Sequence, residues 1–262
     1  MDRLRPYEAL ASAWRAVRVR DVRVREVACV GAPRTLLLAE MGSAGAPTIS
    51  LSAGVHGDEP AAPWALLSLV RDGLLDARFA YRIWPCLNPS GYVVGTRENA
   101  EGDDVNRSFS RGGTTPEARA VITANRDRRF VLTIDLHEDY EAQGAYVFEP
   151  LAPGASPRFA PMVVRALDDA GLPVQTLDAS FDLGTPPSEE PAYRLERGAV
   201  IVDAEAEARL FKGLPASLFH YRRGTSPLTI ESPRPRPWEE RIATHRVAVT
   251  TALAVLASDK ER

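Results

Sequence analysis

Residues 48–62 read TISLSAGVHGDEPAA, and this stretch decides how the rest of the chain is interpreted. Its first part, residues 48–53, predicts a central strand. Gly54 and Gly57 then give the backbone the freedom to bend sharply. Residues 60–75 have the apolar spacing of a helix. A strand, a sharp bend and a helix in this order are typical of an α/β sheet.

His56 and Glu59 of this bend are side chains of types that bind metal ions. A third, His137, follows residues 130–136, a continuous apolar segment that predicts a core strand. Two imidazoles and one carboxylate are the ligand set of a catalytic zinc site, which leaves a fourth position open for water. Taken alone, Asp58 and Glu59 also fit ordinary acids in the first turn of a helix, where negative charge is favourable.

The composition limits the class of protein. The chain has 262 residues, of which 45% are hydrophobic and 26% charged, and this length fits one large α/β domain or two small ones. A net charge of −3 argues against nucleic acid as the main partner. No apolar run approaches the roughly 20 residues of a membrane span, and the N-terminal residues lack the apolar segment of a signal peptide. Cys29 and Cys86 lie in apolar segments, as buried thiols in a reducing cytosol would. We therefore expect a cytoplasmic protein without a membrane partner.

The remaining segments complete an alternating pattern of strands and helices. Helices are predicted over residues 7–19, 116–126, 157–170 and 238–257, the last of them amphipathic, and strands over residues 27–30, 35–40, 80–87, 145–148, 199–203 and 228–231. Such alternation predicts a mainly parallel or mixed sheet covered by helices on both faces. Ligands bind at the carboxyl ends of strands in such folds, and His56, His137 and Glu231 lie at the ends of three predicted strands.

The connecting segments carry signals of their own. Residues 88–91 (NPSG) predict a turn, and residues 91–115 predict one long polar loop, of a length that is usually functional. Residues 232–237 (SPRPRP) predict an extended crossing segment without regular structure. Residues 170–225 match no motif, and we expect them to build a specificity pocket.

Five short motifs follow one another between residues 50 and 233: HGDE, NPSG, RENAEGDDVNRSF, DLH and TIESP. In this order they resemble the zinc carboxypeptidase superfamily, most closely its compact bacterial branch near aspartoacylase and succinylglutamate desuccinylase. The resemblance implies one catalytic domain over residues 1–262 that binds one zinc ion. It also implies a three-layer α/β fold, with a twisted, mixed, mainly parallel sheet of about eight strands flanked by helices.

The resemblance also implies a role for each residue in these motifs. His56, Glu59 and His137 match the three zinc ligands. Asp104 matches an acid that hydrogen-bonds a ligand histidine, which fixes the tautomer of the ring. Glu231 matches the general base that activates water. Taken singly, Asp104 also fits a turn cap and Glu231 also fits an exposed charge at a strand end.

Three residues of the long loop match substrate-binding positions. Asn106 and Arg107 match the pair that grips a substrate carboxylate, and a bidentate guanidinium suits that group. Arg97 matches the residue that polarises the scissile carbonyl. Arginines in a solvated surface loop are the alternative interpretation.

Several acids and rings near the motifs have no matched role. Asp135 fits a turn or an acid that supports a ligand. Glu138 and Asp139 fit solvated acids, or contacts to the metal or to a basic substrate group. We expect His220 to be structural, and we keep Tyr221 as a candidate for a mobile tyrosine of the site.

The leading hypothesis is a zinc-dependent hydrolase that cleaves an amide bond next to a free carboxylate, most simply a metallocarboxypeptidase acting on small peptides. The alternative is an N-acyl amino acid amidohydrolase. A third hypothesis, from a different class, is a metal-binding protein without catalytic activity. All four catalytic and ligand positions are filled, which disfavours the third. The sequence predicts neither the side-chain preference nor the oligomeric state.

Overall fold

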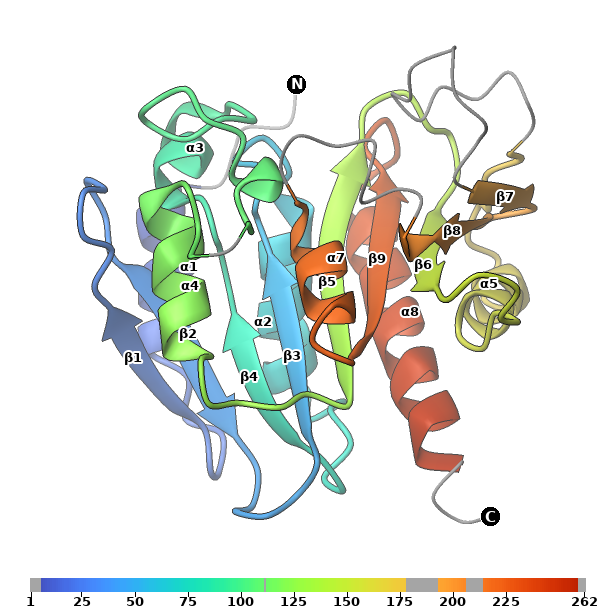
Figure 1. Cartoon of the computed structure of the whole chain (residues 1–262), viewed down its shortest axis with the longest axis horizontal. Helices are drawn as coiled ribbons and strands as arrows, with labels where there is room; N and C mark the ends of the chain where they lie inside the picture. The colour runs from blue at the N-terminus through green and yellow to red at the C-terminus, as the bar shows by residue number, and fades with distance from the viewer. Residues whose placement is uncertain (1–5, 111, 178–192, 206–213, 259–262) are drawn as a thin grey trace.

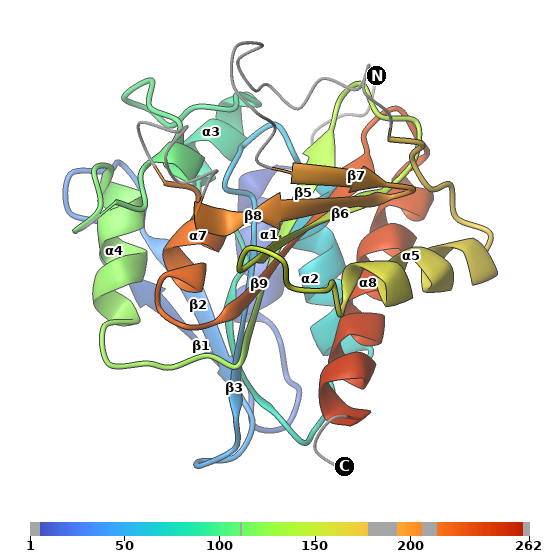
Figure 2. The same cartoon turned by 45° about the vertical axis from the view of Figure 1, so that its right-hand side comes forward.

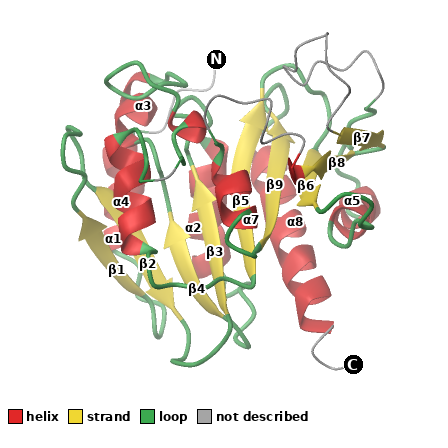
Figure 3. Ribbon diagram, in the orientation of Figure 1, coloured by secondary structure: helices red, strands yellow, loops and turns green. Residues whose placement is uncertain are grey.

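The computed structural model describes residues 6–110, 112–177, 193–205 and 214–258 (Figure 1). These residues form one sheet of nine strands in the order β1-β2-β4-β3-β5-β9-β6-β8-β7. Helices cover both faces of the sheet, with α2 and α8 behind it and α4 and α7 in front in the view of Figure 3. The predicted three-layer α/β fold with about eight strands is therefore confirmed.

The strands in the middle of the sheet run parallel, and those toward its edges are mixed. The strands are β1 (Arg23–Val27), β2 (Leu36–Met41), β3 (Thr48–Ala53), β4 (Ala80–Trp84), β5 (Leu132–Asp139), β6 (Tyr146–Leu151), β7 (Tyr193–Glu196), β8 (Ala199–Asp203) and β9 (Ser226–Pro233). β4, β3, β5 and β9 are parallel neighbours, whereas β6 runs antiparallel to β9 and parallel to β8. The carboxyl ends of the four parallel strands therefore meet at one edge, where a site can be built from several strands.

The helices divide between the two faces of the sheet. They are α1 (Tyr7–Arg15), α2 (Ala61–Arg71), α3 (Pro89–Val94), α4 (Pro116–Ala124), α5 (Ala160–Asp169), α7 (Ala216–Tyr221) and α8 (Trp238–Ser258). α8 packs against α2, α5 and β9, and the rotated view of Figure 2 shows α2, α8 and α5 on the same side of the sheet. The larger core lies between these helices and the sheet, with Leu51, Ile134, Leu66 and Val249 fully buried.

The buried face of α8 confirms the predicted amphipathic helix, with one unexpected property. Its buried residues recur every three or four positions along the helix. The later part of this stripe is apolar, but its first part consists of Arg241, Thr244 and His245, all fully buried. Fully buried polar side chains at consecutive helical turns indicate a polar layer between α8 and the sheet.

Local signals shifted several predicted boundaries. The strand predicted at residues 27–30 is β1 (Arg23–Val27), because the amide of Ala32 bonds the carbonyl of Cys29 and starts the turn earlier. α5 begins later than predicted, where the carboxylate of Glu149 accepts the amides of residues 158–160. Residues 232–237 do not form the predicted extended segment, because Ser232 and Pro233 still pair with β5 and the amide of Arg236 bonds the carbonyl of Pro233 in a turn before α8.

Two further interpretations of the connecting segments were wrong. The turn predicted at residues 88–91 is the start of α3, where the Asn88 side chain accepts the amide of Gly91 and caps the helix. The loop predicted over residues 91–115 also contains a single 3₁₀ turn, η1 (Val105–Arg107), capped by Asp104. The signals that predicted a turn and a loop are here the signals that begin short helices.

Candidate metal centre

The loop after β3 delivers two of the predicted ligands. Gly54 adopts a φ of +61°, which turns the chain away from β3. Gly57 lies against the backbone of α3, so closely that a Cβ atom there would stand 2.0 Å from the carbonyl carbon of Gly91. This close contact requires glycine. It fixes the loop so that His56 and Glu59 face the carboxyl end of β5.

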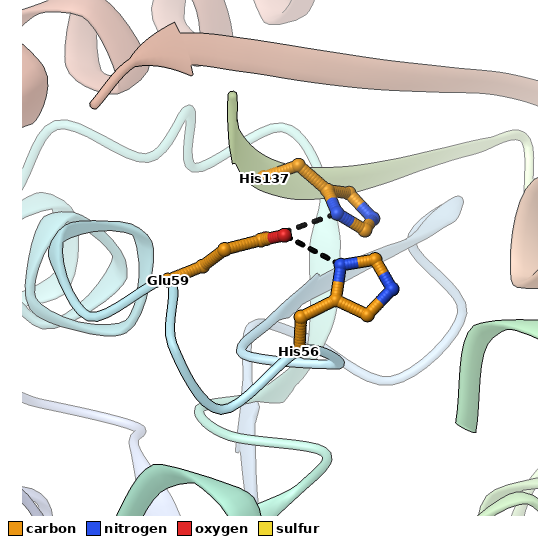
Figure 4. A group of neighbouring side chains, drawn as sticks. All are labelled: His56, Glu59 and His137. Carbon is orange, nitrogen blue, oxygen red and sulfur yellow. Dashed lines mark hydrogen bonds and ion pairs between the residues drawn. The ribbon is translucent and has the colours of Figure 1, made fainter. Parts of the chain in front are cut away.

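The three predicted ligands converge on one point (Figure 4). His56 and Glu59 come from the loop, and His137 comes from within β5. The Nδ1 atom of His56 lies 2.5 Å from Oε1 of Glu59, and the Nδ1 atom of His137 lies 3.0 Å from Oε2. One ligand atom from each of the three side chains lies within 4.8 Å of the others, and all three are buried. Two imidazole nitrogens and a carboxylate at this spacing fit a divalent ion with zinc-like preferences.

Each ring presents its other nitrogen to a second carboxylate. The Nε2 atom of His56 lies 3.5 Å from Oδ1 of Asp104, and the Nε2 atom of His137 lies 3.3 Å from Oδ2 of Asp135. A carboxylate behind a ligand ring holds the proton on that side and leaves Nδ1 free to bind metal. Asp104 thus lies beside a predicted ligand histidine, and Asp135 lies within β5 beside the ring of His137 rather than in a turn.

The charges of the cluster favour a cation at its centre. Burial opposes ionisation of Glu59, but His56 and His137 hold its pKa well below the ordinary value. Burial lowers the pKa of His56, yet the charges of Glu59 and Asp104 outweigh burial and raise it. Positive charge is therefore stabilised between these side chains, and a divalent ion can replace the protons that the rings otherwise carry.

A cavity of about 400 Å³ opens from the ligands. One side of it comes from the loop before α4, with Arg97, Asn106 and Arg107. The opposite side comes from β9 and from the strands beyond it, with Glu231, Thr229, Tyr146, Phe148, Pro150 and Val202. All eight residues that the sequence predicted for the site lie at or beside this cavity.

The side chains of the loop are held in place by neighbours. Arg97 donates to Oδ2 of Asp104 through Nε at 3.1 Å and Nη2 at 2.9 Å, and its Nη1 lies 3.3 Å from Nδ1 of His56. The side-chain oxygen of Asn106 accepts the amide of Ala216 at 3.1 Å, which fixes the orientation of the amide group. These contacts place the guanidinium of Arg97 beside the predicted ligand His56 and fix the amide of Asn106 in the cavity wall.

Glu231 lies in the cavity wall beside the ligands. In the parallel pairing of β5 and β9, Glu231 stands opposite His137, and in the pairing with β6 it stands opposite Tyr146. The pKa of Glu231 is raised to about 8, mainly by burial. The charge of His137 lowers this pKa, and the charges of Glu59 and Asp139 raise it further. A carboxylate with a pKa near neutrality can both accept and return a proton.

Sequence reasoning missed or misjudged several residues of this region. Glu138 is no solvated acid, because its side chain is fully buried against Arg241. Asp139 accepts a hydrogen bond of 2.5 Å from the hydroxyl of Tyr146. Tyr146 carried no motif, and only its place in a strand beside β9 brings it to the cavity.

His220 and Tyr221 lie outside the cavity wall. His220 is buried between the rings of Phe130 and Phe219, at centroid distances of 5.7 and 5.3 Å, as expected of a structural residue. Tyr221 lines a separate surface depression with Arg222 and not the cavity. Of the segment expected to form a specificity pocket, Val202, Pro215 and Ser217 reach the cavity, and residues 178–192 and 206–213 lie outside the described part of the chain.

The family model of the succinylglutamate desuccinylase/aspartoacylase catalytic domain matches residues 45–180. The chain belongs to this family. Hydrolases of the zinc carboxypeptidase superfamily share its fold, and the predicted resemblance is thereby confirmed. Among the described residues of this family member, no helix has both the length and the hydropathy needed to cross a bilayer.

Carboxypeptidases are among the proteins similar to this family member. Carboxypeptidase SOL1 of Arabidopsis thaliana is 32% identical over 111 residues, and the match spans 35% of this chain but only 23% of that relative. A protein from Shewanella amazonensis that has been proposed to be a metallopeptidase superposes with a TM-score of 0.71 at 23% identity, covering 95% of this chain and 92% of the other. A metallo-carboxypeptidase from Burkholderia cenocepacia superposes with a TM-score of 0.68 at 19% identity, covering 96% and 68%. At these identities the structures establish the fold.

Proposed function

We propose that this protein is a zinc-dependent hydrolase that cleaves an amide bond next to a free carboxylate, most simply a metallocarboxypeptidase acting on small peptides as a single catalytic domain. One observation carries the proposal. His56, Glu59 and His137 converge at the end of a cavity whose walls carry a carboxylate, Glu231, and two guanidinium groups. An ion, a base and cationic groups are the parts that amide hydrolysis next to a carboxylate requires.

The proposed chemistry divides between the ion and the side chains. Zinc held by His56, Glu59 and His137 would act as a Lewis acid and would lower the pKa of a water molecule to about 7. Glu231 accepts a proton from the attacking water and returns it to the leaving amine. Arg97, whose Nη1 lies 3.3 Å from His56, donates to the oxygen that becomes negative as the carbonyl is attacked.

The substrate carboxylate is proposed to bind at the other end of the loop. Arg107 and Asn106 line the cavity together, and their donors match the two oxygens of a carboxylate. The amide held by Ala216 keeps its orientation without the substrate, so little conformational freedom is lost on binding. Asn106 and Arg107 line the same cavity as the proposed metal ligands. The site therefore favours substrates whose scissile amide lies close to a terminal carboxylate.

An N-acyl amino acid amidohydrolase is the second candidate, and the match to the succinylglutamate desuccinylase/aspartoacylase family favours it. An N-acyl amino acid also presents an amide next to a free carboxylate, so the same groups would act on it. The similarity to carboxypeptidases of Arabidopsis thaliana and Burkholderia cenocepacia supports the peptidase. A metallo-carboxypeptidase of Pseudomonas aeruginosa with a TM-score of 0.61 was solved in complex with a succinic acid derivative, which supports a carboxylate-binding cavity.

A metal analysis combined with a substrate panel tests the proposal. We expect the purified protein to contain one zinc per chain and to release C-terminal residues from blocked dipeptides. His137→Ala serves as the control, with neither stoichiometric metal nor activity. Cleavage of N-acyl amino acids without trimming of dipeptides would select the second candidate. Stoichiometric zinc without hydrolysis of either class would instead select a metal-binding protein without catalytic activity.

A further inference from the structure

We propose that the buried ion pair between Glu138 and Arg241 is a positioning device that holds Glu59 in its metal-binding orientation from the far side of the sheet. The inference rests on the proposed function, because it takes Glu59 as a metal ligand. It assigns a role to two fully buried charged residues that take no part in the proposed chemistry.

Glu138 lies next to the ligand His137 in β5, and its side chain points to the other face of the sheet. Successive residues of a strand alternate between faces, so His137 faces the metal centre while Glu138 faces α8. There Oε1 accepts from Nε of Arg241 at 2.5 Å, and both side chains have no exposed surface. The other oxygen, Oε2, accepts the amide of Ala61 at 2.7 Å. The carboxylate of Glu138 in β5 thus contacts both the first residue of α2, Ala61, and Arg241 of α8.

These contacts hold Glu59 at two points. The backbone amide of Glu138 donates to Oε2 of Glu59 at 3.2 Å, and the same oxygen faces Nδ1 of His137 at 3.0 Å. The side chain of Glu138 meanwhile fixes the amide of Ala61, two residues after Glu59. The backbone amide of Glu138 therefore orients the carboxylate of Glu59. The side chain of Glu138 fixes the backbone two residues after Glu59, at Ala61.

Arg241 contacts an aromatic ring and lies in a buried polar layer. The guanidinium lies over the ring of Trp238, 5.2 Å from its centroid, and belongs to the polar first part of the buried stripe of α8. Ser232, which stands opposite Glu138 in β9, is fully buried in the same layer. The polar layer of α8 therefore lies directly behind the metal centre.

Stability alone does not account for such a pair. Two charges lose much of their hydration when they are buried, and apolar residues of similar volume in their place are often neutral or stabilising. A pair that does not maximise stability can still specify one geometry. Here that geometry is the relative position of β5 and α2. Glu59 lies between these two elements and takes its orientation from them.

The decisive test separates positioning from stability by comparing single and double variants. Glu138→Gln leaves Arg241 buried without its charged partner, so we expect both a lower melting temperature and weaker zinc binding. The double variant Glu138→Leu/Arg241→Met removes both charges, so we expect its melting temperature to recover. Its zinc affinity should remain about 10- to 100-fold weaker than that of the parent protein, as for other groups that support metal ligands.

Zinc affinity is measured by competition with a chromophoric chelator, and the absorption spectrum of the cobalt-loaded protein reports ligand geometry. Neither readout depends on hydrolysis, so a protein that binds zinc without cleaving any substrate would overturn only the proposed function. Recovery of both stability and zinc affinity in the double variant would show a merely structural pair and overturn the inference. If the double variant does not fold, unchanged zinc affinity and cobalt spectrum in Glu138→Gln would overturn it equally.

A matched control comes from a second buried arginine. Arg82 of β4 is buried, ion-paired with Glu40 and hydrogen-bonded to Asn125, and it does not line the cavity. We expect Arg82→Met to lower the melting temperature while zinc affinity stays within about twofold of the parent protein, since metal affinity depends on groups that orient the ligands. An equal loss of zinc affinity in this control would mean that global destabilisation causes the effect, and the positioning role would be refuted.

Discussion

The proposed chemistry depends most on Glu231, because its strand places a carboxylate beside the proposed ligand His137. Burial raises its pKa to about 8, which suits a group that exchanges protons near neutral pH. Glutamine at this position keeps the shape of the side chain but cannot accept a proton.

We expect Glu231→Gln to lower kcat by about a thousandfold, within the range that positioned general acid–base groups contribute, while zinc content is unchanged. Glu149→Gln is the control, since that buried acid accepts the amides of Phe159 and Ala160 at the start of α5 and should affect stability without affecting kcat. Steady-state kinetics and metal analysis of both variants decide the matter. A Glu231→Gln rate within tenfold of the parent protein would remove Glu231 as the base.

His220 binds a proton less readily in the folded protein than in the unfolded chain. Burial lowers its pKa to about 4, against an ordinary value of 6.5. The unfolded chain therefore binds more protons than the folded protein between these values, so the stability contributed by neutral His220 is lost as the pH falls below about 6.5. At pH 5 the loss amounts to about 2 kcal/mol, since each pH unit corresponds to about 1.4 kcal/mol.

Leucine in place of His220 cannot be protonated. We expect the fall in unfolding free energy between pH 7 and pH 5 to be about 2 kcal/mol smaller in His220→Leu than in the parent protein. Urea denaturation with a chelator present measures this difference without a contribution from metal release. Identical slopes for the two proteins would show that His220 is already protonated, or solvated, in the folded state.

At the scale of elements, the loop between β3 and α2 depends on its contact with α3. A Cβ atom at Gly57 would lie 2.0 Å from the carbonyl carbon of Gly91 and 2.1 Å from the amide of Tyr92. Both neighbours are backbone atoms, which cannot rotate away. The loop must therefore move as a whole, and the ligands on either side of Gly57 must move with it.

We expect Gly57→Ala to cost about 3 kcal/mol of unfolding free energy, as severe overpacking does, and to weaken zinc binding as well. Gly73→Ala is the matched control, because Gly73 has open space around it but a φ of +64°. That substitution should cost about 1 kcal/mol through backbone strain and leave zinc affinity unchanged. Denaturant unfolding and chelator competition measure both effects. Normal zinc affinity in Gly57→Ala would show that the loop adapts without displacing its ligands.

Elements with strong local signals could be predicted from the sequence, and the others could not. β3 and β8 were predicted with their observed bounds because each is a short apolar run between turn residues. α3 was missed because NPSG fits a turn as well as a helix cap. β7 and α7 were missed because their few residues carry no periodicity. Short elements take their structure from neighbours rather than from their own sequence.

The candidate site divides in the same way. His56, Glu59 and His137 could be predicted because they lie in short motifs whose order along the chain is recognisable. Glu138 and Arg241 could not, since 103 residues separate them and nothing in either segment points to the other. Motifs reveal the groups that perform chemistry, whereas the groups that hold them depend on packing across the sheet.

At the scale of the whole molecule, the ion should contribute to the stability of the fold. The ligands come from the loop after β3 and from β5, so an unfolded chain does not present them together. An ion that binds only the folded state stabilises it in proportion to the logarithm of its concentration over Kd. Metal removal should therefore lower the melting temperature.

We expect a chelator to lower the melting temperature by about 10 °C and added zinc to restore it, which corresponds to about 4 kcal/mol at a thousandfold excess over Kd. His137→Ala, which lacks one ligand, should show no response to either addition. Thermal unfolding followed by circular dichroism provides the measurement. A melting temperature that ignores both chelator and zinc in the parent protein would contradict a resident ion.

The reversal of strand direction at β6 has a consequence for how the enzyme can change. The proposed ligands and the proposed base stand on the parallel part of the sheet or directly after it, whereas Tyr146, Phe148 and Pro150 on β6, with Val202 on β8, supply the far wall of the cavity. Substitutions at these wall positions are expected to change substrate preference while leaving the proposed ligands and base in place. This far wall can therefore vary independently of the strands that carry the proposed ligands and base.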